Sequence, residues 1–445
     1  MKKLIILHLF LLTSVFVFAQ SKAEKMEELV NAYYQNGKFN GVVLVAEKGQ
    51  PVFQSGYGFR DAEQASLHDI GSIFQIGSIT KQFTAALIMQ LEQEKKLSVK
   101  DKLSKYFKGF KNGDQITIEH LLTHTSGIYN YTNDSLVMQR DVTRHYSRDE
   151  MLELFKSYPP DFEPGAKFNY SNSGYILLGY IAEKAGKKSF EQLMHEKIFR
   201  PLGMNNTGFD FTHLEHPKKS NGYFVISTDT IIPAPVVDST IAHAAGAIYS
   251  TAGDLLKWER AIFTSKILNE GAWNKVFTPF KSKYGYGWVI DSATGRELHA
   301  HSGGIHGFSS YIIRFPAEEL VVVLLDNSSK QVSAIAKSLA AISLGEKYTI
   351  PEVRREIKIT KEQLHHYVGE YQLAPQFFIT ITTEGNKLMA QATGQSAFEI
   401  YPEKTDVFFY KVVDAKIEFH KDNNGVVNGM TLHQNGMQLP GKKIK

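Results

Sequence analysis

Ser78 and Lys81 form a Ser-x-x-Lys pattern that occurs once in this chain of 445 residues. On a helix, residues three apart share a face, so the amine of Lys81 is expected one turn above the hydroxyl of Ser78. A serine hydroxyl becomes a nucleophile when a base removes its proton, and a lysine can be that base if burial lowers its pKa. The unpaired N–H groups at a helix start suit a developing oxyanion. The pattern predicts covalent catalysis through Ser78; a capping serine followed by a surface lysine is the structural alternative.

Tyr170-Ser171-Asn172 is a second polar cluster, placed between the turn sequence Glu163-Pro164-Gly165 and a helical period. A tyrosine beside a lysine can carry a proton, because both groups titrate near about 10 and each can lower the pKa of the other. The amide of Asn172 can hold a substrate carbonyl. The alternative is an ordinary helix start, in which Asn172 or Ser173 caps the helix and Tyr170 packs.

His301-Ser302-Gly303-Gly304 is a third cluster, which precedes strand-like sequence at Tyr311. Glycines let a backbone approach a ligand closely, and strand N–H groups can bind a substrate carbonyl. The side chains of His301 and Ser302 can hold a carboxylate or pass a proton. A plain loop is the alternative.

The histidines also allow a metal hypothesis. His120 and His124 have the spacing of a helical ligand pair, but no glutamate follows the first histidine as it does in zinc peptidases. His299, His301 and His306 would be the ligands of a metallohydrolase, yet no cluster of acidic residues accompanies them. The sequence therefore favours a reaction without metal or cofactor.

Apolar residues at the spacing of strands or of helices indicate which elements position these clusters. A hairpin is expected over residues 40–60, and Phe83, Leu87 and Leu91 mark one face of a helix that begins near Ile79. A second helix is expected over 173–185, with Gly186 as its stop. Strands are expected at 284–290, 311–315 and 320–325. The economical arrangement is an α+β fold, in which one antiparallel sheet is flanked by helices and a helical subdomain.

The region after Gly345 differs from what precedes it. Residues 346–360 are charged and lack an apolar period, as linkers often do, and five short β-like runs follow between residues 377 and 433. The chain is therefore expected to contain a hydrolase domain over 20–345, a linker over 346–360 and an all-β, barrel-like domain over 361–445.

The first residues have the pattern of an export signal. Met1-Lys2-Lys3 is followed by mostly apolar sequence up to Phe18, which is shorter than the roughly twenty residues of a bilayer span. A signal peptide over 1–19 is expected, with a retained anchor as the alternative, so the mature protein is expected in the periplasm or outside the cell without a stable membrane span.

Charge and cysteine content exclude several classes. The 50 Lys and Arg residues nearly balance the 46 Asp and Glu residues, with a formal net charge of +4, so the chain does not have the basic surface of a nucleic-acid-binding protein. It has no cysteine, so it has neither disulfides nor a thiol nucleophile. The expected partner is a small-molecule or peptide substrate, and the oligomeric state cannot be inferred.

Taken in order, the three clusters resemble the motifs of the serine β-lactamase and penicillin-binding protein superfamily. The chain most resembles the class C β-lactamase-related serine hydrolases, a group with D-alanyl-D-alanine carboxypeptidases, D-amino-acid peptidases and esterases. The resemblance extends to longer blocks at 74–77 (FQIG), 118–127 (IEHLLTHTSG), 168–181 (FNYSNSGYILLGYI), 244–258 (AAGAIYSTAGDLLKW) and 301–311 (HSGGIHGFSSY). His120 and His124 belong to the block at 118–127, so the resemblance explains their presence without a metal site.

This resemblance implies a role for each matching residue. Ser78 is the acylated nucleophile, Lys81 its base and Tyr170 the proton shuttle to the leaving group. Asn172 orients the substrate amide, and the third motif is formed by His301, Ser302 and Gly303. The N–H groups of Ser78 and Gly304 form the oxyanion hole.

The third motif departs from the Lys-Thr-Gly of typical β-lactamases, since histidine replaces the lysine. An ordinary histidine is mostly uncharged at neutral pH, which weakens the clamp on a carboxylate and favours peptidase or esterase activity over antibiotic hydrolysis. Tyr367-Val368-Gly369-Glu370-Tyr371 opens a region that resembles an appended lipocalin-like domain. A sensor or scaffold that becomes acylated without turnover is the alternative to a hydrolase.

Overall fold

The computed structural model describes residues 20–226, 230–411, 413, 415–434 and 436–445. The expected signal peptide at 1–19 lies outside the described residues. No helix in these ranges is both long enough and apolar enough to cross a membrane.

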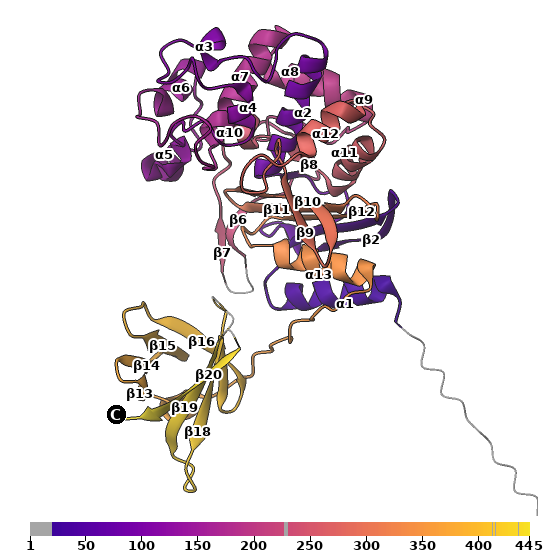
Figure 1. The fold of residues 1–445 in the computed structure, drawn as a ribbon. Helices are drawn as coiled ribbons and strands as arrows, with labels where there is room; N and C mark the ends of the chain where they lie inside the picture. The colour runs from indigo at the N-terminus through magenta and orange to yellow at the C-terminus, as the bar shows by residue number, and fades with distance from the viewer. Residues whose placement is uncertain (1–19, 227–229, 412, 414, 435) are drawn as a thin grey trace, which may run out of the picture.

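A six-stranded antiparallel sheet forms the centre of the first part of the chain (Figure 1). Its order is β2-β1-β12-β11-β10-β9, so the early hairpin pairs with the last strand of this part. The strands are β1 (Gly41–Glu47), β2 (Gln50–Tyr57), β9 (Val289–Ala293), β10 (Arg296–Ile305), β11 (Phe308–Phe315) and β12 (Leu320–Asp326). The predicted α+β architecture is confirmed.

Both faces of this sheet are apolar, because its central strands are covered on each side. Every residue of β12 is buried, as its run of leucine and valine predicts. Val321, Val323 and Leu325 face the helical layer, whereas Val322 and Leu324 face the opposite side. Alternate residues of one strand therefore belong to two separate cores.

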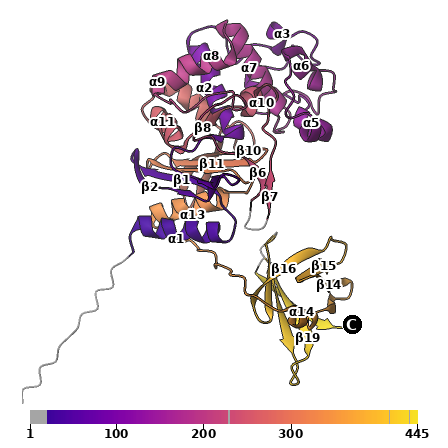
Figure 2. The same ribbon diagram turned by 180° about the vertical axis from the view of Figure 1, so that it is seen from behind.

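Two helices, α1 (Lys22–Gln35) and α13 (Ser333–Leu344), cover one face of the sheet, and the helical region covers the other (Figures 1 and 2). The helices of that region are α2 (Thr80–Gln93), α3 (Leu103–Tyr106), α4 (Ile118–Leu122), α5 (Ser135–Arg140), α6 (Arg148–Lys156), α7 (Asn172–Gly186), α8 (Phe190–Met194), α9 (Arg200–Leu202), α10 (Ser239–Gly246), α11 (Ala252–Phe263) and α12 (Glu270–Phe277). Short helical turns are η1 (Gly77–Ile79), η2 (Tyr131–Asn133) and η3 (His195–Phe199).

Short two-stranded ribbons complete the first part of the chain. They pair β3 with β4, β5 with β8 and β6 with β7. Their strands are β3 (Phe59–Asp61), β4 (Ser66–Leu67), β5 (Phe74–Gln75), β6 (Tyr223–Ile226), β7 (Ile231–Pro233) and β8 (Tyr249–Ser250).

Two expected boundaries are wrong. Most of 284–290 is not strand: Tyr284 forms only isolated bridges with Lys281 and Val289, the Gly285 N–H bonds to the Trp288 carbonyl, and β9 begins at Val289. Gly186 does not stop α7; it is the last helical residue, and Lys187 takes the left-handed conformation with φ of 55°. A lysine at this position offsets the conformational cost with its own backbone bond to the Glu183 carbonyl.

The last part of the chain is a closed barrel of eight antiparallel strands, which confirms the barrel-like prediction. The short helix α14 (Lys361–His365) precedes it, and no helix or strand occurs in 346–360. The strands are β13 (Gly369–Ala374), β14 (Phe377–Glu384), β15 (Lys387–Ala392), β16 (Phe398–Lys404), β17 (Val407–Tyr410), β18 (Ala415–Lys421), β19 (Val427–Gln434) and β20 (Met437–Lys443). The five predicted runs correspond to β14, β15, β17, β18 and β19.

A buried ion pair joins the helical layer to the sheet. Glu259 of α11 is fully buried, and its Oε2 lies 3.2 Å from Nε of Arg314 on β11. The guanidinium also lies over the ring of Phe263 at 4.2 Å. Burial raises the pKa of Glu259 to about 7, although the charge of Arg314 opposes this shift. The pair is therefore sensitive to the loss of either partner.

Arg314→Met is expected to lower the free energy of unfolding by about 3–5 kcal/mol, because it leaves the Glu259 carboxyl buried without a cation. The pKa of this carboxyl is already raised in the folded state, so the loss is larger at about pH 8 than at about pH 5. Denaturant unfolding measures both effects. The double variant Glu259→Gln, Arg314→Met is the control and recovers much of the loss; equal stability of the two variants would contradict this account.

Candidate active site

Ser78 lies in η1, where the chain turns from the short strand β5 into helix α2. Two hydrogen bonds fix Ile76, the residue before η1. Its N–H donates to the Ile248 carbonyl, and its carbonyl accepts from Ser310 Oγ at 2.8 Å. Gly77 then takes a φ of +51°, which favours glycine. The sheet and the ribbon therefore set the position of Ser78, which remains partly exposed.

The amine of Lys81 contacts three oxygen atoms. Its Nζ lies 3.0 Å from Ser78 Oγ, 2.8 Å from Asn172 Oδ1 and 2.8 Å from the carbonyl oxygen of Ala245. The side chain is completely buried, and burial lowers the pKa of Lys81 well below its ordinary value. No carboxylate is within ion-pair distance of this amine among the described residues.

The neutral form of this amine matches its surroundings. A neutral amine has two N–H donors and one lone pair, and the Asn172 and Ala245 oxygens can only accept. With both N–H groups used in this way, the lone pair is left for the Ser78 O–H. The arrangement can therefore remove the proton of the serine hydroxyl.

The Ala245 carbonyl is available because α10 ends at Gly246, so this carbonyl of the last turn has no partner within the helix. His243 has φ of 32° and ψ of −134°, which interrupts the helical bonding, and the Ala244 carbonyl accepts from Thr84 Oγ1 at 2.7 Å. Two successive carbonyls of α10 thus bond to side chains of α2. Residue types alone give no sign of this contribution.

Asn172 is the first residue of α7, and its side chain does not cap that helix. Its Nδ2 donates to Thr132 Oγ1 at 3.1 Å, while its backbone N–H donates to Asn130 Oδ1 at 3.0 Å. Asn130 and Thr132, which the sequence did not single out, therefore hold the amide against Lys81. Ser173 accepts from the Tyr131 N–H, so it does not cap either.

Tyr170 is partly buried beside the amine, with Lys81 Nζ 4.9 Å from the centre of its ring. The expectation that the lysine lowers the pKa of Tyr170 is wrong in direction: burial raises it, and a hydrogen bond with Ser78 only partly opposes that shift. The phenol is therefore protonated at neutral pH and can donate a proton.

His124 packs against Tyr170 and was not assigned a chemical role from the sequence. The two ring centres are 4.2 Å apart, and the rings of Tyr175 and Tyr284 also surround the imidazole. His124 Nδ1 accepts from the Ser171 N–H at 3.1 Å, so the ring carries its proton on Nε2. Burial lowers the pKa of His124 well below its ordinary value, which keeps it neutral.

Gly304 supplies a backbone N–H next to Ser78. Ile305 lies opposite Phe308 across the turn between β10 and β11, and bonding alternates along an antiparallel pair, so the Gly304 N–H points away from β11. β9 pairs with β10 only as far as Ala300, which leaves this edge open. A Cβ placed on Gly77 would lie 2.8 Å from Gly304 N, so the two segments are in close approach.

The rest of the third motif is arranged differently from Gly304. His301 is buried; its Nδ1 donates to the Ser302 carbonyl at 2.7 Å and its Nε2 accepts from the Tyr284 hydroxyl at 2.8 Å. Burial lowers the pKa of His301 to about 4. Ser302 is exposed and points to the opposite face of β10, and Gly303 packs against Ile76. His301 therefore provides no positive charge at neutral pH.

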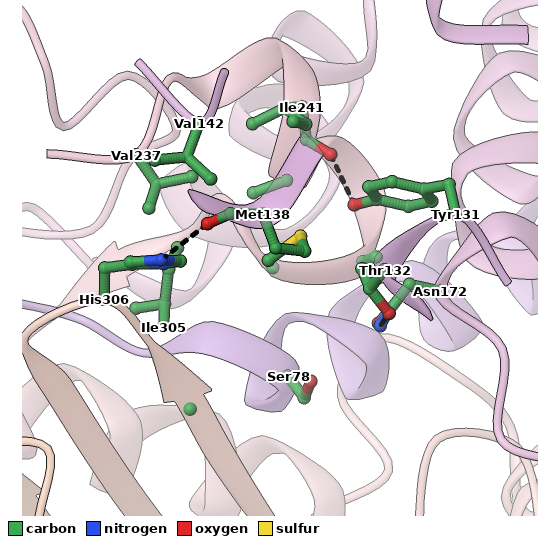
Figure 3. Close-up of a pocket in the computed structure, with 14 residues that line it drawn as sticks. Ser78, Tyr131, Thr132, Met138, Val142, Asn172, Val237, Ile241, Ile305 and His306 are labelled. Atoms are coloured by element: carbon green, nitrogen blue, oxygen red, sulfur yellow. Dashed lines mark hydrogen bonds between the residues drawn. The ribbon is translucent and has the colours of Figure 1, made fainter. Parts of the chain in front are cut away.

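A cavity of about 270 Å³ opens beside Ser78 (Figure 3). Asn172 and Gly304 line it together with residues of α5, α10 and the end of β10. The structure thus brings Ser78, Lys81, Tyr170, Asn172 and Gly304 together.

The three histidines of the metal hypothesis have separate partners. His299 Nε2 lies 2.7 Å from Glu297 Oε1, and His306 Nε2 donates to the Met138 carbonyl at 3.1 Å. In the described part of the chain, no three His, Asp or Glu side chains are grouped as metal ligands would be.

Comparison with known proteins gives two family matches. The family described as Beta-lactamase matches residues 26–345. Residues 353–443 match a domain of unknown function, DUF3471, so the likeness of the barrel to lipocalins stays a prediction.

Individual relatives agree with the first match. A penicillin-binding protein of Bacillus subtilis (strain 168) is 27% identical over 432 residues, which cover 90% of this chain and 94% of that protein. Among solved structures, the octameric penicillin-binding protein homologue from Pyrococcus abyssi has a TM-score of 0.68 and 26% identity, covering 94% of this chain and 99% of that chain. A D-stereospecific amidohydrolase from Streptomyces has a TM-score of 0.63 and 25% identity, covering 74% of this chain and 100% of that chain. The chain therefore belongs to the beta-lactamase family of serine hydrolases.

Proposed function

We propose that this protein is an exported hydrolase that works through an acyl-enzyme on Ser78, with D-amino-acid peptides, small esters or β-lactams as substrates. The observation that carries the proposal is the completely buried Lys81 amine, 3.0 Å from Ser78 Oγ, with carbonyl acceptors for both of its N–H groups. Export to the periplasm or the medium rests on the signal-like sequence at 1–19.

In acylation, the Ser78 hydroxyl passes its proton to Lys81 while Oγ forms a bond to the substrate carbonyl carbon. The carbonyl electron pair moves to the oxygen, where the N–H groups of Ser78 and Gly304 stabilise the negative charge. When the tetrahedral intermediate collapses, the bond to the leaving group breaks and Tyr170 donates a proton to it. Lys81 returns a proton to Tyr170, and water then releases the acid by the same steps in reverse order.

His124 acts in this scheme as a positioning residue for Tyr170. It has a φ of +56°, a strained conformation for a residue with a side chain, and its carbonyl accepts from the Asn169 N–H while Nδ1 accepts from the Ser171 N–H. Two backbone bonds thus flank Tyr170, and the imidazole packs on its ring. This arrangement limits the movement of the phenol.

Two kinds of observation bear on the substrate class, the relatives of the chain and the charge state of His301. The similar Streptomyces protein is an amidohydrolase with D-stereospecificity, and the B. subtilis relative is a penicillin-binding protein. The neutral state of His301 weakens recognition of a substrate carboxylate, which favours peptides and esters over β-lactams. A penicillin-binding sensor or scaffold that is acylated without efficient turnover is the alternative to a hydrolase.

The C-terminal barrel, over 361–445 in the proposed division of the chain, is assigned a role in stability or assembly. Its interior is filled by its own apolar side chains, among them Ile381, Ile417 and Met430. A lipocalin-like relationship rests on the motif that begins at Tyr367.

A fluorophosphonate probe is expected to label the wild-type protein and to leave Ser78→Ala unlabelled, because the Ser78 hydroxyl lies 3.0 Å from the buried Lys81 amine, which can take its proton. Mass spectrometry of the labelled peptide locates the adduct. Equal labelling of both proteins would contradict the assignment, and a labelling burst with no steady-state hydrolysis of any ester or D-peptide would favour the sensor.

Because burial lowers the pKa of Lys81, kcat/KM is expected to reach its plateau well below about pH 10, the ordinary pKa of lysine. As a base, Lys81 must be neutral, so kcat/KM is expected to rise as the pH increases through the lowered pKa of this amine. Lys81→Arg cannot lose its proton in this range and is expected to lose at least ~100-fold in kcat/KM at every pH. A variant that keeps the wild-type pH profile would exclude Lys81 as the base.

His124→Ala is expected to lower kcat for anilide substrates by about tenfold to a hundredfold, because these leaving groups need a proton from Tyr170. Nitrophenyl esters, whose leaving group departs without protonation, are expected to lose much less. His124→Asn, which tolerates positive φ and can accept the Ser171 N–H, is the matched control and restores part of the anilide activity. An equal loss for both substrate classes would show a purely structural role.

A further inference from the structure

The cavity beside Ser78 has a wall of apolar side chains. Its volume is about 270 Å³, which falls just below the range of roughly 300–1,000 Å³ for pockets that hold drug-sized ligands. It is therefore suited to a group about as large as one amino-acid side chain. The apolar residues that line it are Met138, Val142, Val237, Ile241, Ala242 and Ile305 (Figure 3).

The polar groups in this wall already have partners inside the protein. The Tyr131 hydroxyl donates to the Ile241 carbonyl at 2.6 Å, and His306 Nε2 donates to the Met138 carbonyl at 3.1 Å (Figure 3). The side-chain amide of Asn172 bonds to Lys81 and Thr132. Among the described residues that line the cavity there is no Asp, Glu, Lys or Arg. A charged group placed here would lose its hydration without gaining an ion partner.

The position of the cavity indicates which half of the substrate enters it. Ser78, Asn172 and Gly304 contribute to the lining, whereas Tyr170 is not among the described lining residues. In the proposed mechanism Tyr170 protonates the leaving group, so the leaving group lies on the Tyr170 side of Ser78. The cavity then receives the acyl half, and this step rests on the proposed function.

We propose that this cavity is the acyl-group subsite and that it selects esters and amides whose acyl part is uncharged, apolar and about the size of one side chain. Substrates with a carboxylate on the acyl group are rejected, because no Lys or Arg among the described lining residues can pair with it. Met138 is a specificity-determining residue, since its partly exposed side chain lies in the wall and only its backbone carbonyl bonds to His306.

The test compares p-nitrophenyl butyrate with p-nitrophenyl hemisuccinate, which has the same leaving group and differs mainly by a carboxylate at the end of the acyl chain. Wild-type kcat/KM is expected to favour the butyrate by on the order of a hundredfold. Equal kcat/KM for the two esters would overturn the proposal without any variant. If neither ester is hydrolysed and fluorophosphonate does not label Ser78, the proposed function itself fails, which is a separate outcome.

Met138→Lys introduces a cation of similar length into the wall and is expected to shift the ratio toward the hemisuccinate by about tenfold or more. Met138→Leu is the matched control and keeps the wild-type preference. Equal ratios for these two folded variants would show that Met138 does not face the acyl group and would overturn its assignment. Circular dichroism and labelling of Ser78 establish that both variants are folded.

Discussion

Removing the side-chain amine of Lys81 from water is the physical constraint on which the site depends. An ammonium group in this position would lose its hydration, and no carboxylate within ion-pair distance compensates for it among the described residues. Burial favours the neutral amine, and its three oxygen neighbours suit that form when two of them accept its N–H groups and the Ser78 hydroxyl faces its lone pair. The packing that stabilises the helical layer therefore also produces a base next to the serine.

The surrounding elements are arranged to keep this environment. The Ser310 hydroxyl fastens η1 to the sheet, α10 turns two carbonyls toward α2, and Asn130 and Thr132 hold the amide of Asn172. His124 and Tyr284 fill the space behind Tyr170 with neutral aromatic groups. Each of these contacts excludes water or fixes an orientation, and none adds a charge to the site. His301 follows the same principle, since both of its nitrogens are bonded and burial keeps it uncharged.

Much of the fold could be predicted because its strands and helices have clear apolar periods. The hairpin of β1 and β2, the helices α2 and α7 and the strand β12 lie close to their expected ranges. The barrel strands β16 and β20 were not predicted, because Pro402 and Pro440 interrupt them and such residues seldom signal a strand. Their neighbours in the closed barrel supply the pairing that their own sequence does not favour.

The site was predictable where a motif marks the residue, whether it acts through its side chain or, as at Gly304, through its backbone N–H. Ser78, Lys81, Tyr170 and Asn172 meet as their motifs suggested, but motifs gave no warning that burial would raise the pKa of Tyr170 or that Ser302 would face away. Ala245 shows why: its carbonyl, not its methyl group, contacts the Lys81 amine, and that carbonyl is available because α10 ends one residue later. Alanine scanning would pass over this residue entirely, so the acceptor that orients the Lys81 amine can be probed only by altering the main chain, for example with an ester linkage in place of the peptide bond.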